Sequence, residues 1–219
     1  DLYNEIYGAL YQQATDKDDV STQCRALCAM SYHFISKKDY DAAKQSAEKA
    51  YDTLHSAGDS AATNIDRAFC LQCMSRVTWH SSEEPTDKDR AMVLAKRALD
   101  IFKSSLGLRS VQTLYANELY GWMLMQKESY QTARHYYNVS DFLVRELLDE
   151  HPEMLHGYDC RRFIWDGLYL FARATDTAKK ASDVANKYYG DHPVSATMAL
   201  RLCESIIKRG SLNDAIDAS

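Results

Sequence analysis

The chain has 219 residues, of which 46% are hydrophobic, and its 26 Lys and Arg against 31 Asp and Glu give a formal charge of −5. A phosphate-binding face needs clustered cations, but basic pairs such as Lys37-Lys38 are isolated, so no nucleic-acid partner is expected. No apolar run reaches the ~18 residues of a membrane span, so no membrane insertion is expected. The composition, with 3 Pro and 8 Gly, predicts an all-α protein.

The chain begins at Asp1 without a Met and stops at Ser219 inside a helix-like segment. We find no secretory signal. We therefore expect a cytoplasmic protein, and we expect this sequence to be a fragment of a longer one.

Taken in order, the chain predicts paired helices. Residues 1–14 look like the end of a preceding helix. The first full pair covers 20–56, with a tight turn at Lys37 to Tyr40 and regularly spaced small residues in its second helix. Those residues are Ala43, Ala47 and Ala50.

The second pair, 61–106, has a longer internal turn, His80 to Thr86, and Thr86 with Asp89 predicts the start of its second helix. We favour a tolerated insertion for this turn, although a projecting contact site is an alternative.

The third pair, 110–150, shows most clearly how two helices approach each other. Gly121 and Ala133 are small residues where the helices are expected to cross, and Tyr120, Leu124 and Tyr137 fill the space around them.

The fourth pair, 154–189, has a first helix, with the stretch FIWDGLYLFA (163–172), that is apolar almost all round and includes Asp166, where a small residue is expected. Either Asp166 pairs with Arg162, four residues earlier, or the register slips locally. The fifth pair, 194–219, is expected to turn at Gly210-Ser211. Its exposed apolar face needs a missing C-terminal partner or another molecule to cover it. A homo-oligomer formed through the terminal repeats is one such arrangement.

The six cysteines all fall in helical, apolar surroundings, which favours reduced thiols in the core. A zinc site is the alternative, because Cys70 and Cys73 have CxxC spacing and Cys24 and Cys28 could complete the ligand set. These cysteines fall inside predicted helices, which argues against the zinc site. We expect no metal and no cofactor.

The order of large residue, Gly, bulky residue, Ala and aromatic in the third pair resembles the tetratricopeptide (TPR) repeat. The small residues that open successive second helices recur at intervals above the usual ~34 residues. With the turns in ALDIFKSSLGLRSVQTLY and YYGDHPVSATMAL, these long repeats are similar to those of kinesin light chains. The resemblance implies an α-solenoid of antiparallel helix pairs, coiled into a right-handed superhelix over residues 1–219.

In kinesin light chains, adjacent Asn residues on the first helices clamp the backbone of a cargo peptide. This chain lacks them, and the Lys/Asn clamp of chaperone-binding TPR proteins is absent at the same places, so neither ligand class is expected. The matching positions hold Cys28-Ala29, Phe69-Cys70, Glu118-Leu119, Phe163-Ile164 and Leu200-Arg201.

No phosphate-binding, dinucleotide-binding or hydrolase motif is present, so we expect no enzyme. The clearest functional signal is the set of aromatic and charged residues that the first helices would present to a concave groove, where they would bind a peptide or protein. The set comprises Tyr32, Phe69, Cys73, Arg76, Tyr115, Glu118, Trp122, Phe163 and Leu170.

Two other functions stay open. The chain could be the regulatory or substrate-recruiting part of a larger enzyme, since the helical domain of SET and MYND methyltransferases has similar turns. It could also be a self-assembling structural module.

Overall fold

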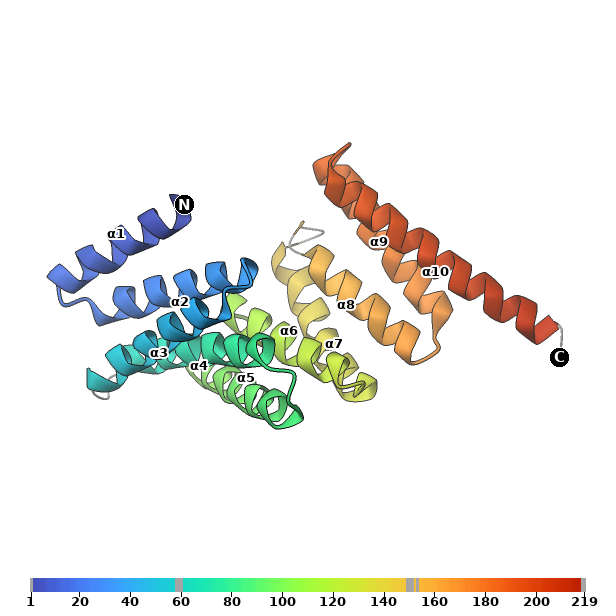
Figure 1. The fold of residues 1–219 in the computed structure, drawn as a ribbon. Coiled ribbons are helices and arrows are strands. Elements are labelled where there is room, and N and C mark those ends of the chain that lie inside the picture. Colours follow the sequence, from blue (N-terminus) through green and yellow to red (C-terminus); the bar gives the residue numbers. More distant parts are fainter. Residues whose placement is uncertain (1, 58–60, 149–151, 153, 218–219) are drawn as a thin grey trace. The chain divides into compact units, whose positions relative to one another are not determined.

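The computed structural model describes residues 2–57, 61–148, 152 and 154–217, and within them it shows ten helices and no strand (Figure 1). An all-α fold is therefore confirmed. The helices are α1 Leu2–Asp16, α2 Val20–Ser36, α3 Tyr40–Ser56, α4 Ala61–Ser81, α5 Pro85–Leu106, α6 Val111–Gln126, α7 Tyr130–Leu148, α8 Met154–Gly167, α9 Phe171–Tyr189 and α10 Pro193–Asp217.

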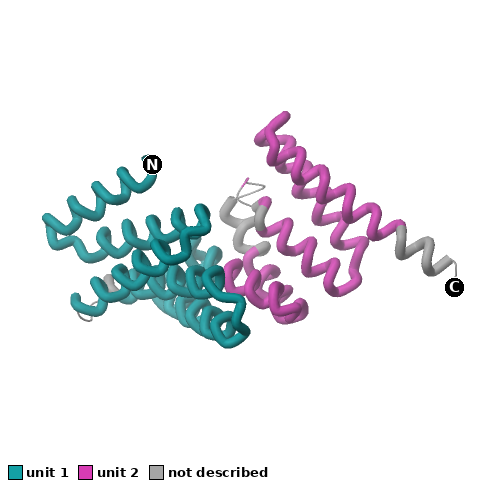
Figure 2. The backbone as a smooth tube through the Cα atoms, viewed as in Figure 1, with its two compact units in different colours: residues 1–116 teal, residues 117–219 magenta. Residues whose placement is uncertain are grey.

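The chain divides into two compact units (Figure 2). The first is Asp1–Ala116 and the second is Asn117–Ser219. In the first unit α2 packs on α3, α3 on α4 and α4 on α5, while α2 also contacts α4 directly. In the second unit α7 packs on α8, α8 on α9 and α9 on α10. Within each unit, helices that follow one another in the chain are neighbours, as expected for helix pairs.

Three of the turns inside helix pairs share one backbone design. Lys38, Glu128 and Tyr169 have φ angles of 61°, 58° and 57°. In each turn the next backbone N–H donates to a carbonyl five residues earlier, as from Leu170 N to Trp165 O at 2.8 Å. This is the Schellman end of a helix, where glycine is the residue with the least steric penalty.

Near its C-terminal end, the first helix of a pair comes close to the second. In the three pairs with a left-handed turn residue, this position lies seven residues before that residue. Ser31 Oγ donates to Ala43 O at 2.8 Å, and Ser75 Oγ donates to Ala91 O at the same distance in the second pair. A Cβ on Gly121 would lie 3.0 Å from Tyr137 Cε2. Small side chains therefore set the close approach in these pairs, as predicted.

The fourth pair breaks this rule, because the residue seven positions before its turn is Arg162, which is 1% exposed. Its guanidinium contacts Asp159 Oδ1 at 3.2 Å and Asp166 Oδ2 at 3.3 Å. The predicted pairing of Asp166 with Arg162 is confirmed. The small-residue position, however, is that of Arg162 and not of Asp166.

Three predicted helix boundaries differ from the structure. The stretch 163–172, predicted to lie in one apolar helix, contains the end of α8 at Gly167, a turn with Tyr169 at a φ of 57°, and the start of α9 at Phe171.

α5 begins at Pro85 after Glu84, one residue before the predicted Thr86, since proline is well suited to the first position of a helix. α10 continues through Gly210 and Ser211, where we expected a turn, because Gly210 adopts no left-handed conformation that would end the helix.

The cysteines are free thiols, and five of them are buried as predicted, whereas Cys203 is exposed. Within the described residues, no group of three or more potential ligands could hold a metal ion. No described helix combines the length and apolarity that crossing a bilayer requires.

Candidate functional site

The nine predicted groove residues are divided between the two units and differ in exposure. Cys73 is fully buried and Glu118 is 9% exposed, so these two belong to the interior rather than to an open surface. Tyr115, Phe163 and Leu170 are 40%, 38% and 38% exposed. The half-buried members are Tyr32, Phe69, Arg76 and Trp122.

The structure brings three of these residues together on neighbouring helices of the first unit. Arg76 of α4 lies over the ring of Tyr32 in α2, with Cζ 5.3 Å from the ring centre. Arg25 of α2 lies over the ring of Phe69 in α4, at 5.4 Å. Each helix thus contributes one arginine and one aromatic ring, seven residues apart. We call Arg25, Tyr32, Phe69 and Arg76 the α2/α4 face.

The two stacks follow from the geometry of the helices. Residues seven apart lie two turns along the same side of a helix. Both stacked pairs have the same sequence separation, so α2 and α4 must run in the same direction side by side. A guanidinium over an aromatic ring contributes about 0.5–1 kcal/mol at an exposed site and more when desolvated. The two stacks therefore stabilise this arrangement of the face.

Further contacts fix the two partners of one stack. Arg25 Nε donates to Asp66 Oδ1 at 3.0 Å, and Asp66 is 1% exposed. The Phe69 ring meets the ring of Phe102 edge-on, with centroids 5.1 Å apart. Since Phe69 and Arg25 are tied to the core through different helices, this half of the face is pre-organised for contact.

The thiols beneath the face belong to the core. Cys73 Sγ donates to Cys28 O at 3.8 Å, and Cys24 Sγ donates to Ala50 O at 3.3 Å. Hydrogen bonding to Cys70 and Cys73, together with burial, raises the pKa of the Cys28 thiol well above its usual range. Burial and the neighbouring Cys73 likewise raise the pKa of Tyr32. Tyr32 and Cys28 therefore stay protonated at neutral pH.

A lysine of α5 caps the C-terminal end of α4, beside this face. Lys88 Nζ donates to Trp79 O at 2.6 Å and lies 5.0 Å from the centre of the Trp79 ring. It also pairs with Glu83 at 3.4 Å. Burial, with Arg76 and Lys88 nearby, lowers the pKa of His80. Only residues 82–84 separate α4 from α5, so the turn is shorter than the predicted His80 to Thr86.

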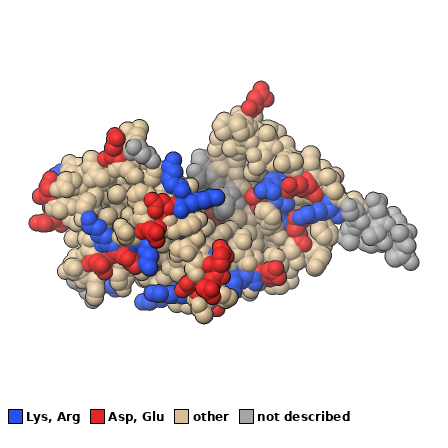
Figure 3. Space-filling view, in the orientation of Figure 1, with Lys and Arg blue, Asp and Glu red and all other residues tan. Residues whose placement is uncertain are grey.

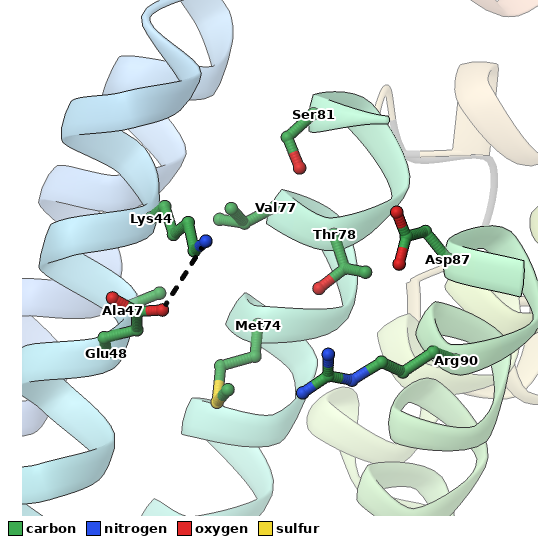
Figure 4. A pocket seen from close by; sticks show the side chains of 9 residues that line it. All are labelled: Lys44, Ala47, Glu48, Met74, Val77, Thr78, Ser81, Asp87 and Arg90. Atoms are coloured by element: carbon green, nitrogen blue, oxygen red, sulfur yellow. Dashed lines mark ion pairs between the residues drawn. The ribbon is translucent and has the colours of Figure 1, made fainter. Parts of the chain in front are cut away.

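On the same unit, α3, α4 and α5 enclose a pocket of about 180 Å³ that sequence reasoning missed (Figure 4). Lys44 and Glu48 of α3 form an ion pair of 4.0 Å at one side. Asp87 and Arg90 of α5 lie at the other side in Figure 4. The pocket is formed by three helices, so no local pattern could have predicted it. The apolar lining consists of Ala47, Met74 and Val77.

In the second unit, two guanidinium groups lie close to the Phe163 ring. Arg162 Cζ is 4.2 Å and Arg201 Cζ is 5.7 Å from its ring centre. Lys208 of α10 pairs with Asp166 at 2.7 Å. The charges here alternate in sign, and on the side drawn in Figure 3 positive and negative groups are interspersed over both units.

The remaining candidates of this unit have other neighbours. Glu118 lies against α8, since a Cβ on Gly157 would be 3.0 Å from Glu118 Oε1. Leu170 is not on a first helix as predicted, because α8 ends at Gly167 and Leu170 is the residue that precedes the first residue of α9. Neither residue contributes to the contacts around Phe163 described above.

Similar proteins were found among solved structures but not by sequence. No protein-family model matches the sequence, and no curated protein matches it. The crystal structure of BtubC (BKLC) from P. vanneervenii is similar, with a TM-score of 0.73 and 12% identity, over 98% of this chain and 84% of that one.

A second similar crystal structure, from Podosopora anserina, is described as a kinesin light chain with nearly identical TPR-like repeats. Its TM-score is 0.72 at 12% identity, over 90% of this chain and 92% of that one. At this identity the likeness concerns the fold alone. It confirms that this chain is built of TPR-like helical repeats resembling those of a kinesin light chain.

Proposed function

We propose that the chain is a non-catalytic interaction scaffold, cytoplasmic in location, which binds a protein or peptide on its first helices. The α2/α4 face carries this proposal. It offers two aromatic rings and two arginines in fixed positions, and such residues are enriched where proteins bind one another. TPR-like repeats supply the rigid support.

The chemistry of the face favours binding over catalysis. Its ionisable groups are two arginines and a tyrosine whose pKa is raised, and none of these is suited to proton transfer at neutral pH. The stacked rings would supply buried apolar area to a partner, and the guanidinium groups would set its register through hydrogen bonds. An extended or helical peptide fits this division of roles.

A charge reversal on the face tests the proposal. Arg76→Glu should lose the proteins that the parent chain captures, because it removes the stack on Tyr32 and repels the partner group that Arg76 binds. Arg90→Glu makes the same charge change on α5 and should retain them. Equal capture by both variants, with unchanged thermal unfolding, would refute a role for the face.

A contribution of α6 to partner binding needs its own variant. Tyr115 and Trp122 are two turns apart on α6 and belong to the predicted groove set. If α6 takes part, changing both to Ala should weaken capture at least tenfold while the helical content stays constant. Undiminished capture would restrict the binding site to α2 and α4.

A further inference from the structure

Within the second unit, α7, α8 and α9 enclose another pocket, of about 280 Å³. Its residues on α9 include exposed ones, so a ligand can enter from the solvent along this helix. We call it the α7/α8/α9 pocket. Its lining includes Asn138 of α7, Arg161 and Trp165 of α8, and Arg173, Asp176 and Lys180 of α9.

Cations from two second helices gather around the Trp165 ring of this pocket. Arg173 Cζ of α9 lies 5.3 Å from the ring centre, and Arg134 Cζ of α7 lies 5.9 Å from it. Lys180 follows Arg173 two turns further along the same side of α9. Among the described residues that line the pocket, Asp176 is the only acid. These cations are far apart in the sequence, and the fold brings them together with an excess of positive charge.

Three of the cations in and beside the pocket have no ion-pair partner within the described residues. Arg161 differs from them, since it is 8% exposed and has a carboxylate neighbour. Its Nη2 atom and Glu118 Oε1 lie 3.8 Å and 3.0 Å from the point where a Cβ on Gly157 would stand. The cations open to a ligand are therefore Arg134, Arg173 and Lys180.

The pocket of the first unit in Figure 4 occupies the same place in its repeat, which allows a comparison of their charges. Lys44 and Arg134 are equivalent, because each lies six residues after a left-handed turn residue. One turn later, α3 has Glu48 and α7 has Asn138. Glu48 pairs with Lys44 at 4.0 Å, whereas the uncharged amide of Asn138 cannot neutralise Arg134.

The second helices of the two pockets differ in the same direction. Arg90 and Arg173 are equivalent, because each directly precedes the first buried alanine of its helix. Beside Arg90, Asp87 adds a second carboxylate to the first pocket (Figure 4). The two cations and two acids of that lining therefore balance, whereas the α7/α8/α9 pocket keeps a net positive charge.

We propose that the α7/α8/α9 pocket binds a phosphate monoester through Arg134, Arg173 and Lys180. A carboxylate has two oxygens and one charge, which a single guanidinium can satisfy. A phosphate monoester carries about −1.5 to −2 charges at neutral pH and three terminal oxygens, so it can use two guanidinium groups and an ammonium together. The Asn138 amide can donate a further hydrogen bond.

Phosphorylated side chains and small sugar or glycerol phosphates all carry this group. The α7/α8/α9 pocket belongs to the second unit, so phosphate binding does not depend on partner binding at the α2/α4 face. Either proposal can fail while the other holds.

Calorimetric titration of the whole chain with two probes tests the proposal. The probes are glycerol phosphate and a short peptide with one phosphoserine between glycines. The chain should bind at least one probe at a single site, and the tighter one identifies the carrier of the phosphate. Glycerol and the unphosphorylated peptide should not bind. Absence of binding by both phosphates, or equal binding of a peptide with glutamate in place of phosphoserine, would overturn the proposal.

Loss of the two guanidinium groups locates the site. Arg134→Gln combined with Arg173→Gln should weaken phosphate binding by about tenfold or more, because charge-assisted hydrogen bonds are lost. Lys44→Gln combined with Arg90→Gln makes the equivalent changes in the first unit and is the matched control, with unchanged binding expected. Equal weakening in both double variants would refute a site in the second unit.

A second variant keeps every cation in place. Asn138→Asp puts a carboxylate at the position that Glu48 occupies in the first unit, and it should weaken phosphate binding by neutralising Arg134. Asn138 is exposed, so the fold should tolerate the change, and circular dichroism checks this for each variant. Phosphate binding that survives both in Asn138→Asp and in the double variant of Arg134 and Arg173 would overturn the proposal.

Discussion

Arg162 occupies the same position in the fourth helix pair that Gly121 occupies in the third. Both lie seven residues before a left-handed turn residue, and both are buried. Gly121 lets the helices approach closely, while Arg162 fills the space with a guanidinium held by Asp159 and Asp166. The repeat therefore tolerates a large cation at this position when two carboxylates neutralise it.

Removing the Arg162 guanidinium should destabilise the folded chain. Arg162→Ala leaves two acidic groups without their partner and opens a cavity, so we expect a loss of about 3–5 kcal/mol in unfolding free energy. Urea denaturation measures it. Arg209→Ala, at an exposed cation on α10, should change stability by no more than about 0.5 kcal/mol. Similar losses for both variants would mean that the buried network contributes little.

Adding a methyl group should distinguish two helical glycines. Gly121→Ala places a Cβ 3.0 Å from Tyr137 and 3.3 Å from Tyr136, so overpacking should destabilise the chain by about 1–3 kcal/mol. Gly210→Ala meets nothing within 4 Å and should stabilise α10 by up to about 1 kcal/mol. Thermal unfolding reports both, and a stable Gly121→Ala variant would contradict the close approach.

Tyr169 is a bulky residue at a φ of 57°, and its side chain is 78% exposed. Because glycine avoids the steric penalty of this conformation, Tyr169→Gly should raise the unfolding free energy by about 1 kcal/mol. The same change at Val93, inside α5, should lower it by a similar amount. A destabilised Tyr169→Gly would show that the tyrosine ring contributes more than its backbone costs.

The pH dependence of stability should carry a contribution from His80. Burial lowers the pKa of His80 below its ordinary value of 6.5, so its stabilising contribution is complete above that pH and is lost as the pH falls toward the folded value. His80→Gln should therefore lose less stability than the parent chain between about pH 7 and pH 5. Parallel stability profiles for the two chains would exclude this role.

Much of the fold was predictable because helix pairing has a local signature. The spacing of Ala43, Ala47 and Ala50 and the pair Gly121 and Ala133 are visible in the sequence. Arg162 was harder to place, since a large cation contradicts the small-residue rule until Asp159 and Asp166 are seen as its partners. The extension of α10 through Gly210 was missed because glycine alone does not end a helix.

The candidate site was less predictable, because it depends on register between helices. Tyr32, Phe69 and Arg76 were identified from sequence, but Arg25 was missed. Its stack on Phe69 becomes apparent only when α2 and α4 are aligned, where both stacked pairs share one separation. Cys73 was predicted for the surface since a single helix pattern does not show which side α2 covers.

Photo-crosslinking from α2 tests most directly whether partners bind the α2/α4 face. Ala29 lies one turn from both Arg25 and Tyr32, so a photoreactive amino acid there should trap a bound protein. The same group at Val93, exposed on α5, should trap none. Adducts from position 29 that disappear with Arg76→Glu are the expected result, and no adduct there, or equal adducts from both positions, would contradict the proposed function.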